Sequence, residues 1–280
     1  MIAALVVAAA FHLPPQKSDA VIGVAAIHLE SGRRLSVRGT ERFPMGSVYK
    51  FPIALTVLRR VDGGELALSQ EVTIAPKDFA PGWSPLREQA KGKAITLTVG
   101  QLLRHMVSIS DNTASDALLR LAGGPPAVSA RMAELGFGGL RLDRSETQMA
   151  GDLAKPNGKA HYAIDVRDTA TPEDMAALLF AFWRGRDGLS KESHALLVTM
   201  MTETVTGARR IKAAVPKGAT VAHKTGTMPG TANDVAVVTT PDGANHIVIA
   251  IFTKGASAKN EICEDDIAAV ARKVYEALAP

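Results

Sequence analysis

The strand-like segments of this chain lie near its two ends, and this arrangement constrains the fold more than any other feature of the sequence. Residues 20–39 have the pattern of two strands joined by a turn at Ser31-Gly32. Three more β-like runs, separated by Gly, Pro and Asp turns, occupy residues 219–255. An amphipathic helix follows over 262–278. We therefore predict that strands from both ends pair into one antiparallel sheet with helices packed on it.

The residues between these two groups of strands have helical periodicity. Apolar residues recur at helical spacing in a helix that starts at Ser47, and in others at 98–112, 113–124, 126–135, 172–184 and 191–204. The sequence thus predicts an α+β fold, with a five-stranded antiparallel sheet flanked by helices and a mostly helical domain. The predicted division of the chain is an N-terminal segment (1–19), an α/β domain that holds the sheet (20–39 with 203–280) and a helical domain (40–202).

The first residues, MIAALVVAAAFHLPPQ, contain a run of ten nearly uninterrupted apolar residues. Such a run is too short to span a bilayer as a helix and is typical of the apolar part of a secretory signal. Small residues in VAAAF offer a cleavage site, although the usual positive charge at the start is missing. We expect an exported protein, periplasmic or secreted, and no later segment predicts a membrane span.

Composition argues against several other classes of protein. The net charge is only +4, aromatic residues make up 5% of the chain, and no basic cluster is interleaved with aromatics, so nucleic acid is not an expected partner. The seven histidines form no H-E-x-x-H pattern and have no C-x-x-C companion, so no metal site is expected. The single cysteine, Cys263, reads as a small buried apolar residue. With no oligomerisation signal, a monomer is the expectation.

A serine precedes a lysine by three residues in MGSVYKFPIAL, where a helix is predicted to begin. On a helix, Ser47 and Lys50 share a face. A serine hydroxyl needs a neighbouring base to act as a nucleophile, and a partly buried lysine can be that base when desolvation or nearby cations lower its pKa. A helix cap followed by a solvated lysine explains the same residues, so this motif alone does not decide.

A second polar cluster, Ser110-Asp111-Asn112, separates two of the predicted helices. These residue types are favoured caps and turn formers, which gives a purely structural explanation. In a functional site, the Ser110 hydroxyl relays a proton and the Asn112 amide holds a substrate amide. Both interpretations stay open on this cluster alone.

A third cluster, VAHKTGT, ends a β-like run with Lys224, Thr225, Gly226 and Thr227. A strand end followed by a turn glycine is the structural explanation. In a functional site, the lysine attracts an anionic substrate, and the glycine lets a ligand approach backbone N–H groups that line an oxyanion hole.

In this order, and on these predicted elements, the three motifs form the signature of class A β-lactamases and penicillin-binding proteins. From about residue 20 onward the sequence resembles class A serine β-lactamases. The resemblance implies a small-molecule β-lactam as substrate, and it implies no metal and no organic cofactor.

The resemblance extends to RSETQMA (144–150) and RDTATP (167–172), which look like the active-site loop of that family. It implies that Glu146 activates the deacylating water and that Arg144 and Asp168 pair across the base of the loop. Three charges on a solvated loop are the alternative. Glu146 favours a β-lactamase over penicillin-binding transpeptidases, which share the three motifs and generally lack this base.

Two further side chains take roles by the same resemblance. Trp83 matches an aromatic residue at the rim of the cleft, with core packing as the alternative. Arg210 resembles an arginine of the family that joins Lys224 in holding the substrate carboxylate. If the match to the family is shifted by one residue, Arg209 takes this role instead.

The loop departs from the family pattern in two ways. Ala150 stands where family members usually have an asparagine that helps to hold the water, as in an extended-spectrum branch. The loop from Arg144 to Asp168 is also longer than usual, with LAKPNGKAHYAI as the extra segment. These departures leave the positioning of the water and the substrate range open.

The resemblance implies a complete reaction path on Ser47. This serine attacks the lactam carbonyl, with Lys50 or a water bound to Glu146 as the proton acceptor. The backbone N–H groups of Ser47 and Thr227 stabilise the oxyanion, and Ser110 protonates the departing nitrogen.

The substrate is held by two groups of side chains in the same scheme. The carboxylate is bound by Lys224, Thr225, Thr227 and Arg210, and the side-chain amide by Asn112. The alternatives to a β-lactamase are a D-alanyl-D-alanine peptidase or transpeptidase acting on peptidoglycan stem peptides, and a β-lactam sensor that stays acylated.

Overall fold

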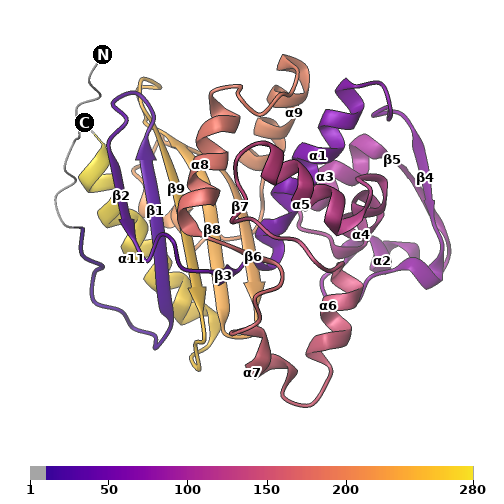
Figure 1. Cartoon of the computed structure of the whole chain (residues 1–280), viewed down its shortest axis with the longest axis horizontal. Coiled ribbons are helices and arrows are strands. Elements are labelled where there is room, and N and C mark those ends of the chain that lie inside the picture. The colour runs from indigo at the N-terminus through magenta and orange to yellow at the C-terminus, as the bar shows by residue number, and fades with distance from the viewer. Residues whose placement is uncertain (1–10, 280) are drawn as a thin grey trace.

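The computed structural model describes residues 11–279, so most of the predicted signal segment lies outside the described residues. One five-stranded sheet dominates the fold, with strand order β2-β1-β9-β8-β7 and every neighbouring pair antiparallel (Figure 1). The predicted antiparallel sheet built from both ends of the chain is confirmed. Its strands are β1 (Val21–His28), β2 (Arg34–Val37), β7 (Thr220–Met228), β8 (Thr231–Thr239) and β9 (His246–Lys254).

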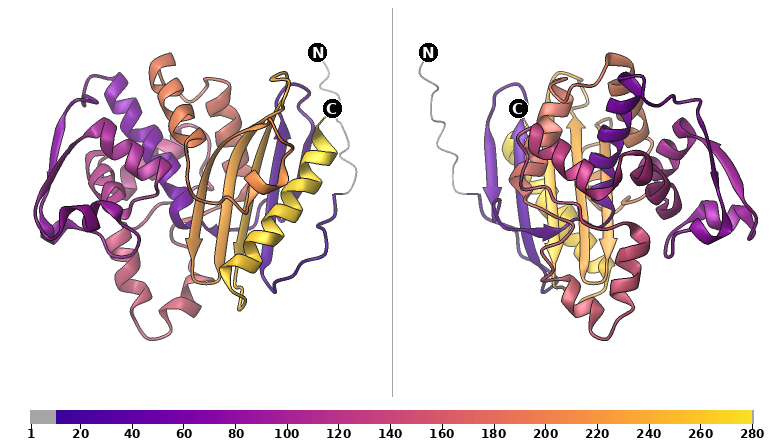
Figure 2. Two further views of the ribbon diagram at one scale, coloured as in Figure 1. Left: turned by 180° about the vertical axis from the view of Figure 1, so that it is seen from behind. Right: turned by 45° about the vertical axis from the view of Figure 1, so that its right-hand side comes forward.

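Helices cover both faces of this sheet, which explains why strands β1, β7, β8 and β9 are buried almost throughout. Helix α11 (Asn260–Leu278) crosses one face (Figure 2), and α8 (Pro172–Trp183) packs against β1 and β9 on the other. Side chains of a strand alternate between the two faces. In β1, Val24 packs in the core cluster under α11, whereas its neighbour Ala25 packs in the cluster shared with the helical part.

The helical part of the chain contains the predicted helices, several of them shorter than predicted. They are α1 (Lys50–Asp62), α3 (Val99–Ser108), α4 (Asn112–Leu121), α5 (Gly124–Glu134), α8 and α9 (Lys191–Thr202). The predicted helix at Ser47 begins instead as a 3₁₀ turn, η1 (Gly46–Tyr49), and becomes α-helical at Lys50. Gly46 has a positive φ of 51°, so the chain turns sharply just before the serine.

Several short elements were not predicted because they are too brief to show periodicity. They are β3 (Phe43–Pro44), β4 (Glu71–Ile74), β5 (Ile95–Thr98), β6 (Thr169–Ala170), η2 (Pro76–Asp78), α2 (Pro85–Ala90), α6 (Glu146–Leu153), α7 (Gly158–Tyr162) and α10 (Ile211–Ala214). The β3–β6 pair matters most for the site, because it joins the segment before Ser47 to the end of the loop of residues 144–168. The Met45 N–H donates to the carbonyl of Asp168 at 2.9 Å.

Cys263 is fully buried in α11, which confirms its predicted place in the core. Within residues 11–279, no helix combines the length and hydropathy needed to cross a bilayer.

Candidate active site

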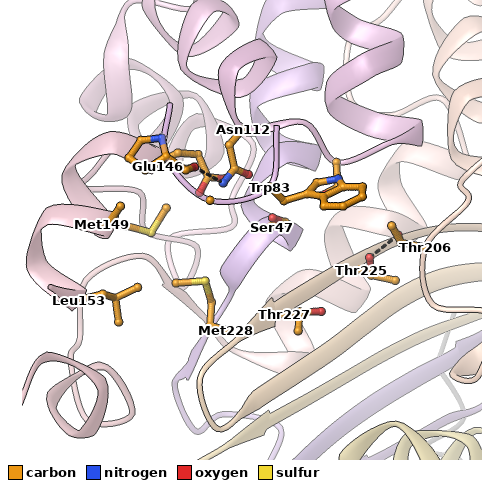
Figure 3. A pocket seen from close by; sticks show the side chains of 14 residues that line it. Ser47, Trp83, Asn112, Glu146, Met149, Leu153, Thr206, Thr225, Thr227 and Met228 are labelled. Atoms are coloured by element: carbon orange, nitrogen blue, oxygen red, sulfur yellow. Dashed lines mark hydrogen bonds between the residues drawn. The ribbon is translucent and has the colours of Figure 1, made fainter. Parts of the chain in front are cut away.

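A cavity of about 450 Å³ opens between the helical part, the loop of residues 144–168 and the edge strand β7 (Figure 3). All three motifs and the loop contribute to it. Its lining is Ser47, Pro81, Gly82, Trp83, Ser110, Asn112, Glu146, Met149, Ala150, Leu153, Thr206, Thr225, Thr227 and Met228. The structure thus brings together residues up to 181 positions apart in the sequence, from Ser47 to Met228.

Ser47 lies on η1, half-buried, at the centre of this cavity. Strand β7 runs so close to it that a Cβ added to Gly226 would overlap the Met45 carbonyl and lie 3.2 Å from the Ser47 nitrogen. Only glycine fits at such an approach. On the other side, a Cβ added to Gly46 would lie 3.3 Å from the Thr227 nitrogen, so the backbone of the serine turn and that of β7 are in contact.

Lys50 is completely buried one helical turn after the serine, so the alternative of a solvated lysine is wrong. Its Nζ donates to the Ser110 carbonyl at 2.8 Å and to Asn112 Oδ1 at 2.7 Å, and it lies 3.0 Å from Glu146 Oε1. A buried ammonium needs such partners because desolvation alone is costly. The lysine therefore links the first motif, the second motif and the loop.

Ser110 connects the two lysines of the site. Its carbonyl accepts from Lys50, and its Oγ accepts from Lys224 Nζ at 2.9 Å. The residue has φ of 65°, a left-handed conformation that is uncommon outside glycine and clusters at functional sites. Burial, with the like charge of Lys50, lowers the pKa of Lys224 well below its ordinary value.

Of the other two residues of the second motif, Asp111 has a structural role and Asn112 lines the cavity. Asp111 is buried and caps α4, accepting from the backbone N–H groups of Ala114 and Leu86 at 2.9 and 2.8 Å. Asn112 lines the cavity, and its amide donates one hydrogen to the Pro81 carbonyl at 3.0 Å. A side-chain amide has two N–H donors, so one remains for a ligand.

Glu146 is the first residue of α6 and is buried against Lys50. A second carboxylate, Asp116 on α4, holds the start of this helix. Its two oxygens accept from the N–H of Glu146 at 2.7 Å, from the N–H of Thr147 at 3.1 Å and from the Thr147 hydroxyl at 2.7 Å. Asp116 was not singled out in the sequence, where its only signal is a carboxylate four residues after Asn112.

The base of the loop is a network of charges around Arg144. Its Nε lies 2.6 Å from Asp168 Oδ2, and its Nη1 lies 2.9 Å from Asp152 and 3.1 Å from Asp165. Burial raises the pKa of the Asp168 carboxyl, against the hydrogen bonds from Arg144 and from backbone N–H groups. The structure therefore brings Arg144 and Asp168 together, and they are buried rather than solvated.

The extra segment of the loop completes α6 and forms the short helix α7. Ala150, on α6, lines the cavity where its methyl group presents no hydrogen-bonding atom. A second charged side chain, Arg167, also binds Asp165 and Asp152, at 2.7 and 3.1 Å, but it is more exposed than Arg144.

The threonines of the third motif have partners outside it. Thr225 shares a 2.6 Å hydrogen bond with Thr206, and the Thr227 hydroxyl accepts from Arg210 Nη2 at 2.6 Å. Arg210 is buried beside β7 and is absent from the residues that line the cavity. Its guanidinium also pairs with Glu264 of α11 at 2.8 Å. It reaches the cavity through Thr227.

Arg209 lies elsewhere, exposed and paired with Asp265 at 2.6 Å. Trp83 is 57% exposed at the cavity, with its Nε1 donating to the Ile109 carbonyl at 2.9 Å. Core packing as an explanation of Trp83 is therefore wrong.

Two groups of residues in the site were missed by the sequence analysis. Asp116, Thr206 and Glu264 hold predicted site residues in place, whereas Met149, Leu153 and Met228 form an apolar wall of the cavity. Contacts of this kind depend on packing between distant segments, and a single sequence carries little signal for them.

The fold and the three motifs around one cavity define the class of serine β-lactamases and penicillin-binding proteins. Comparison with known proteins narrows this class. The model of the β-lactamase enzyme family matches residues 6–278. Beta-lactamase VEB-1 of Pseudomonas aeruginosa is 36% identical over 262 residues, 91% of this chain and 84% of the relative. Extended-spectrum beta-lactamase PER-1 of the same species is 33% identical over 264 residues, 92% of this chain and 82% of the relative.

Solved structures agree with these relatives. A beta-lactamase from Chitinophaga pinensis DSM 2588 has a TM-score of 0.84 and 34% identity, covering 92% of this chain and 94% of that one. A class A beta-lactamase reconstructed as the last common ancestor of Gram-negative bacteria has a TM-score of 0.82 and 36% identity, covering 92% and 94%. The chain belongs to the β-lactamase enzyme family, as a class A serine β-lactamase.

Proposed function

We propose that the enzyme hydrolyses penicillins and cephalosporins through an acyl-enzyme on Ser47, which a water activated by Glu146 then hydrolyses. The observation that carries the proposal is the position of the buried Lys50 Nζ, which lies 3.0 Å from Glu146 Oε1 and donates to Ser110 and Asn112. These three partners line one cavity with Ser47. A buried ammonium–carboxylate pair beside a serine can accept and return its proton.

In the acylation step, Ser47 Oγ attacks the lactam carbonyl carbon and its proton passes to the Lys50–Glu146 pair. The backbone N–H groups of Ser47 and Thr227 stabilise the oxyanion. The contact between the serine turn and β7 supports this role, since it holds both amides on one side of the cavity. The carbon–nitrogen bond then breaks, and Ser110 Oγ gives its proton to the departing nitrogen. The proton that the Lys50–Glu146 pair took from Ser47 passes to Ser110 Oγ in its place, so that Ser110 is again a hydroxyl and Glu146 is again ionised for deacylation.

The substrate carboxylate is held at the β7 end of the cavity by Lys224, Thr225 and Thr227. Arg210 supports this end through its hydrogen bond to Thr227. Lys224 also donates to Ser110 Oγ, so one lysine both attracts the anion and orients the group that protonates the leaving nitrogen. The free N–H of Asn112 donates to the carbonyl of the substrate side-chain amide.

In the deacylation step, Glu146 takes a proton from water, the water oxygen attacks the ester carbon, and Ser47 Oγ recovers a proton as the ester bond breaks. The product is the ring-opened acid. Asp116 supports this step by fixing the start of α6, and thus the position of Glu146. Because Ala150 offers no hydrogen bond, the carboxylate positions the water without an amide at that site.

A chromogenic cephalosporin tests the proposal, followed by absorbance and by the intact mass of the protein. The native enzyme should turn over repeatedly. Ser47→Ala should show neither turnover nor a mass adduct. Glu146→Gln should acylate and then release product about 10²- to 10⁴-fold more slowly, the usual contribution of a general base.

Other outcomes would replace the proposal. A single stoichiometric burst with a lasting adduct in the native enzyme would indicate a β-lactam sensor or a stem-peptide peptidase instead, and cleavage of a D-alanyl-D-alanine peptide would separate those two. Full turnover by Ser47→Ala would exclude the serine mechanism.

We further propose that the enzyme is exported and monomeric. Its two domains are the sheet-bearing part (20–39 and 203–280) and the helical part (40–202). The apolar run near the start supports export, and the cavity at the boundary of the two parts supports this division. Size-exclusion chromatography of the periplasmic fraction tests location and oligomeric state together.

A further inference from the structure

A buried histidine–carboxylate pair lies beside the third motif and has no part in the proposed reaction. His223 of β7 comes directly before Lys224, and its Nδ1 lies 2.9 Å from Oδ1 of Asp234 on β8. Both side chains are completely buried. The other ring nitrogen, Nε2, has no hydrogen-bond partner among the described residues, so Asp234 alone holds the ring by a hydrogen bond. Buried pairs of this kind add little net stability, and their best-attested use is to fix one geometry.

The pair faces the chain segment of residues 206–211, which leads into α10 and is called the arginine segment below. Side chains of a strand alternate between its two faces, so His223 and Thr225 share a face of β7. Both contact the arginine segment. A Cβ added to Gly207 would lie 3.4 Å from His223 Cε1 and would overlap Thr225 Cγ2. Thr206 and Thr225 share a hydrogen bond on the same face (Figure 3).

Asp234 links His223 to the arginine segment. Its Oδ1 lies beside the histidine, and its Oδ2 accepts from the backbone N–H of Ile211 at 3.1 Å. Ile211 follows Arg210 directly and is the first residue of α10. Without His223, one oxygen of a buried carboxylate would lack a partner, and the carboxylate would turn or take up a proton, which weakens its bond to Ile211. The backbone anchor beside Arg210 therefore needs both members of the pair.

The guanidinium of Arg210 makes directional contacts that depend on this anchor. Its Nη1 donates to the carbonyls of Gly226 and Asn233 at 3.0 and 2.7 Å, and its Nη2 donates to the Thr227 hydroxyl at 2.6 Å. Because the Thr227 oxygen accepts from the guanidinium, its own hydrogen is free for a ligand in the cavity. A hydroxyl polarised by a cation in this way is a stronger donor to a carboxylate.

We propose that His223 and Asp234 are positioning residues for the reaction. They anchor the arginine segment so that Arg210 keeps its bond to Thr227, and they thereby raise the selectivity of the enzyme for substrates with a free carboxylate. The inference rests on the proposed function, in which Thr227 helps to hold that carboxylate. It assigns part of the selectivity to a pair that is absent from the described residues lining the cavity.

The test compares benzylpenicillin with its methyl ester, which differ in the charge of the carboxylate. The measured quantity is the ratio of kcat/KM for the acid to kcat/KM for the ester. His223→Leu fills the space of the ring but donates no hydrogen bond. It should lower this ratio about tenfold, mainly through a higher KM for the acid, as expected when a hydrogen bond to a charged group is weakened. His223→Asn places an amide N–H where the ring has Nδ1, so it should keep the ratio within about threefold of the native value.

Two further variants distinguish positioning from a general loss of structure. Val221→Ala removes buried atoms from the same face of β7 and should lower Tm without changing the ratio. In Arg210→Gln the ratio should already be low, and adding His223→Leu should change it less than about twofold, because the pair acts through the arginine. Thermal unfolding shows whether each variant is folded, and His223→Phe, which keeps a ring, replaces His223→Leu if the latter is not.

Three results would overturn the inference and leave hydrolysis through Ser47 intact. They are equal kcat/KM for acid and ester in the native enzyme, an equal fall for acid and ester in His223→Leu, and an undiminished effect of His223→Leu in the Arg210→Gln background. If the native enzyme does not turn over benzylpenicillin at all, the proposed function itself is overturned.

Discussion

The floor of the cavity and the loop above it face the same space, yet different interactions hold them. The floor consists of Ser47 and Ser110, which line the cavity, with Lys50 and Lys224 completely buried behind them. It is built on η1 and α1, the turn between α3 and α4, and the edge strand β7. The loop of residues 144–168 is fixed by ion pairs around Arg144 and by hydrogen bonds to Asp116. In the proposed mechanism the floor carries the nucleophile and the proton donor of acylation, and the loop carries the base of deacylation, with the Lys50–Glu146 pair shared between them. Changes outside this pair should therefore affect mainly one step.

The difference is also one of energetics. Close packing and buried hydrogen bonds make the floor rigid, and its strain at Ser110 persists only because the surroundings impose it. The loop depends on charge pairs, whose strength varies with burial. Selective variants can therefore measure how independent the two regions are.

Apart from changes to the reacting Ser47 and to Glu146, the largest effect should come from Lys224→Met in the floor. The variant loses the cation that attracts the substrate carboxylate and the donor to Ser110 Oγ. We expect acylation to slow about 10²- to 10³-fold, with deacylation within about threefold, because proton relay and charge-assisted bonds contribute effects of this size. Stopped-flow burst kinetics separates the two rates.

Stability is the control for Lys224→Met. The ammonium is desolvated and repelled by Lys50, so its removal should not lower the free energy of unfolding. An equal loss in acylation and deacylation would show that the floor and the loop do not act separately.

Asp116→Ala should produce the next largest effect, this time on the loop. Two backbone N–H groups and the Thr147 hydroxyl lose their acceptor, and Glu146 loses its anchor. We expect deacylation to slow about 10- to 100-fold and stability to fall by about 2 kcal/mol, since buried donors without acceptors are costly. Asp116→Asn keeps one acceptor oxygen, so its deacylation rate and its stability should lie between those of the native enzyme and of Asp116→Ala. A fall in the rate of acylation alone would contradict the prediction.

The sequence predicts the floor better than the loop, for a physical reason. Strands β7, β8 and β9 each have nine residues and are bounded by turns, and each motif of the floor lies at the end of a predicted element. Their assembly follows from pairing the strands of both chain ends. The family resemblance supplied the roles of Ser47 and Lys50, and the structure shows that Lys50 is buried rather than solvated.

The loop carries little local signal. The β3–β6 pair has two residues in each strand, too few for any periodicity, yet it joins the loop to the serine segment. The hydrogen bonds of Asp116, and the pairing of Arg210 with Glu264, depend on how α4 packs on α6 and how α11 packs beside β8. Side-chain partners between distant helices follow from tertiary packing, which a pattern in one sequence does not specify.

Arg144→Gln should have a smaller effect on the loop, and Arg167→Gln is its matched control. Both arginines pair with Asp165 and Asp152, but only Arg144 is buried. We expect Arg144→Gln to lower the free energy of unfolding by about 3 kcal/mol and to slow deacylation about tenfold. Arg167→Gln should cost less than about 1 kcal/mol and change deacylation less than about twofold. Chemical denaturation measures the free energy of unfolding. Equal losses of stability in the two variants would show that the burial of Arg144 does not strengthen its ion pairs.

The smallest effect concerns pH, and it should again separate the floor from the loop. Burial and the charge of Lys50 lower the pKa of Lys224 well below 10.5, so the folded enzyme loses this proton at a lower pH than the unfolded chain. Between the two pKa values the unfolded chain binds more protons, and the contribution of Lys224 to stability rises with pH in that window.

Activity should move in the opposite direction across that window. Acylation should be halved at the lowered pKa of Lys224 and continue to fall above it, because the substrate carboxylate loses its cation. Deacylation should show no limb from this group. Lys224→Arg keeps its charge throughout this range, so its acylation should lack the limb even if its absolute rate is lower. If acylation by Lys224→Arg still falls with pH in this range, the titrating group is not Lys224. If deacylation falls over the same range, the floor and the loop do not act separately.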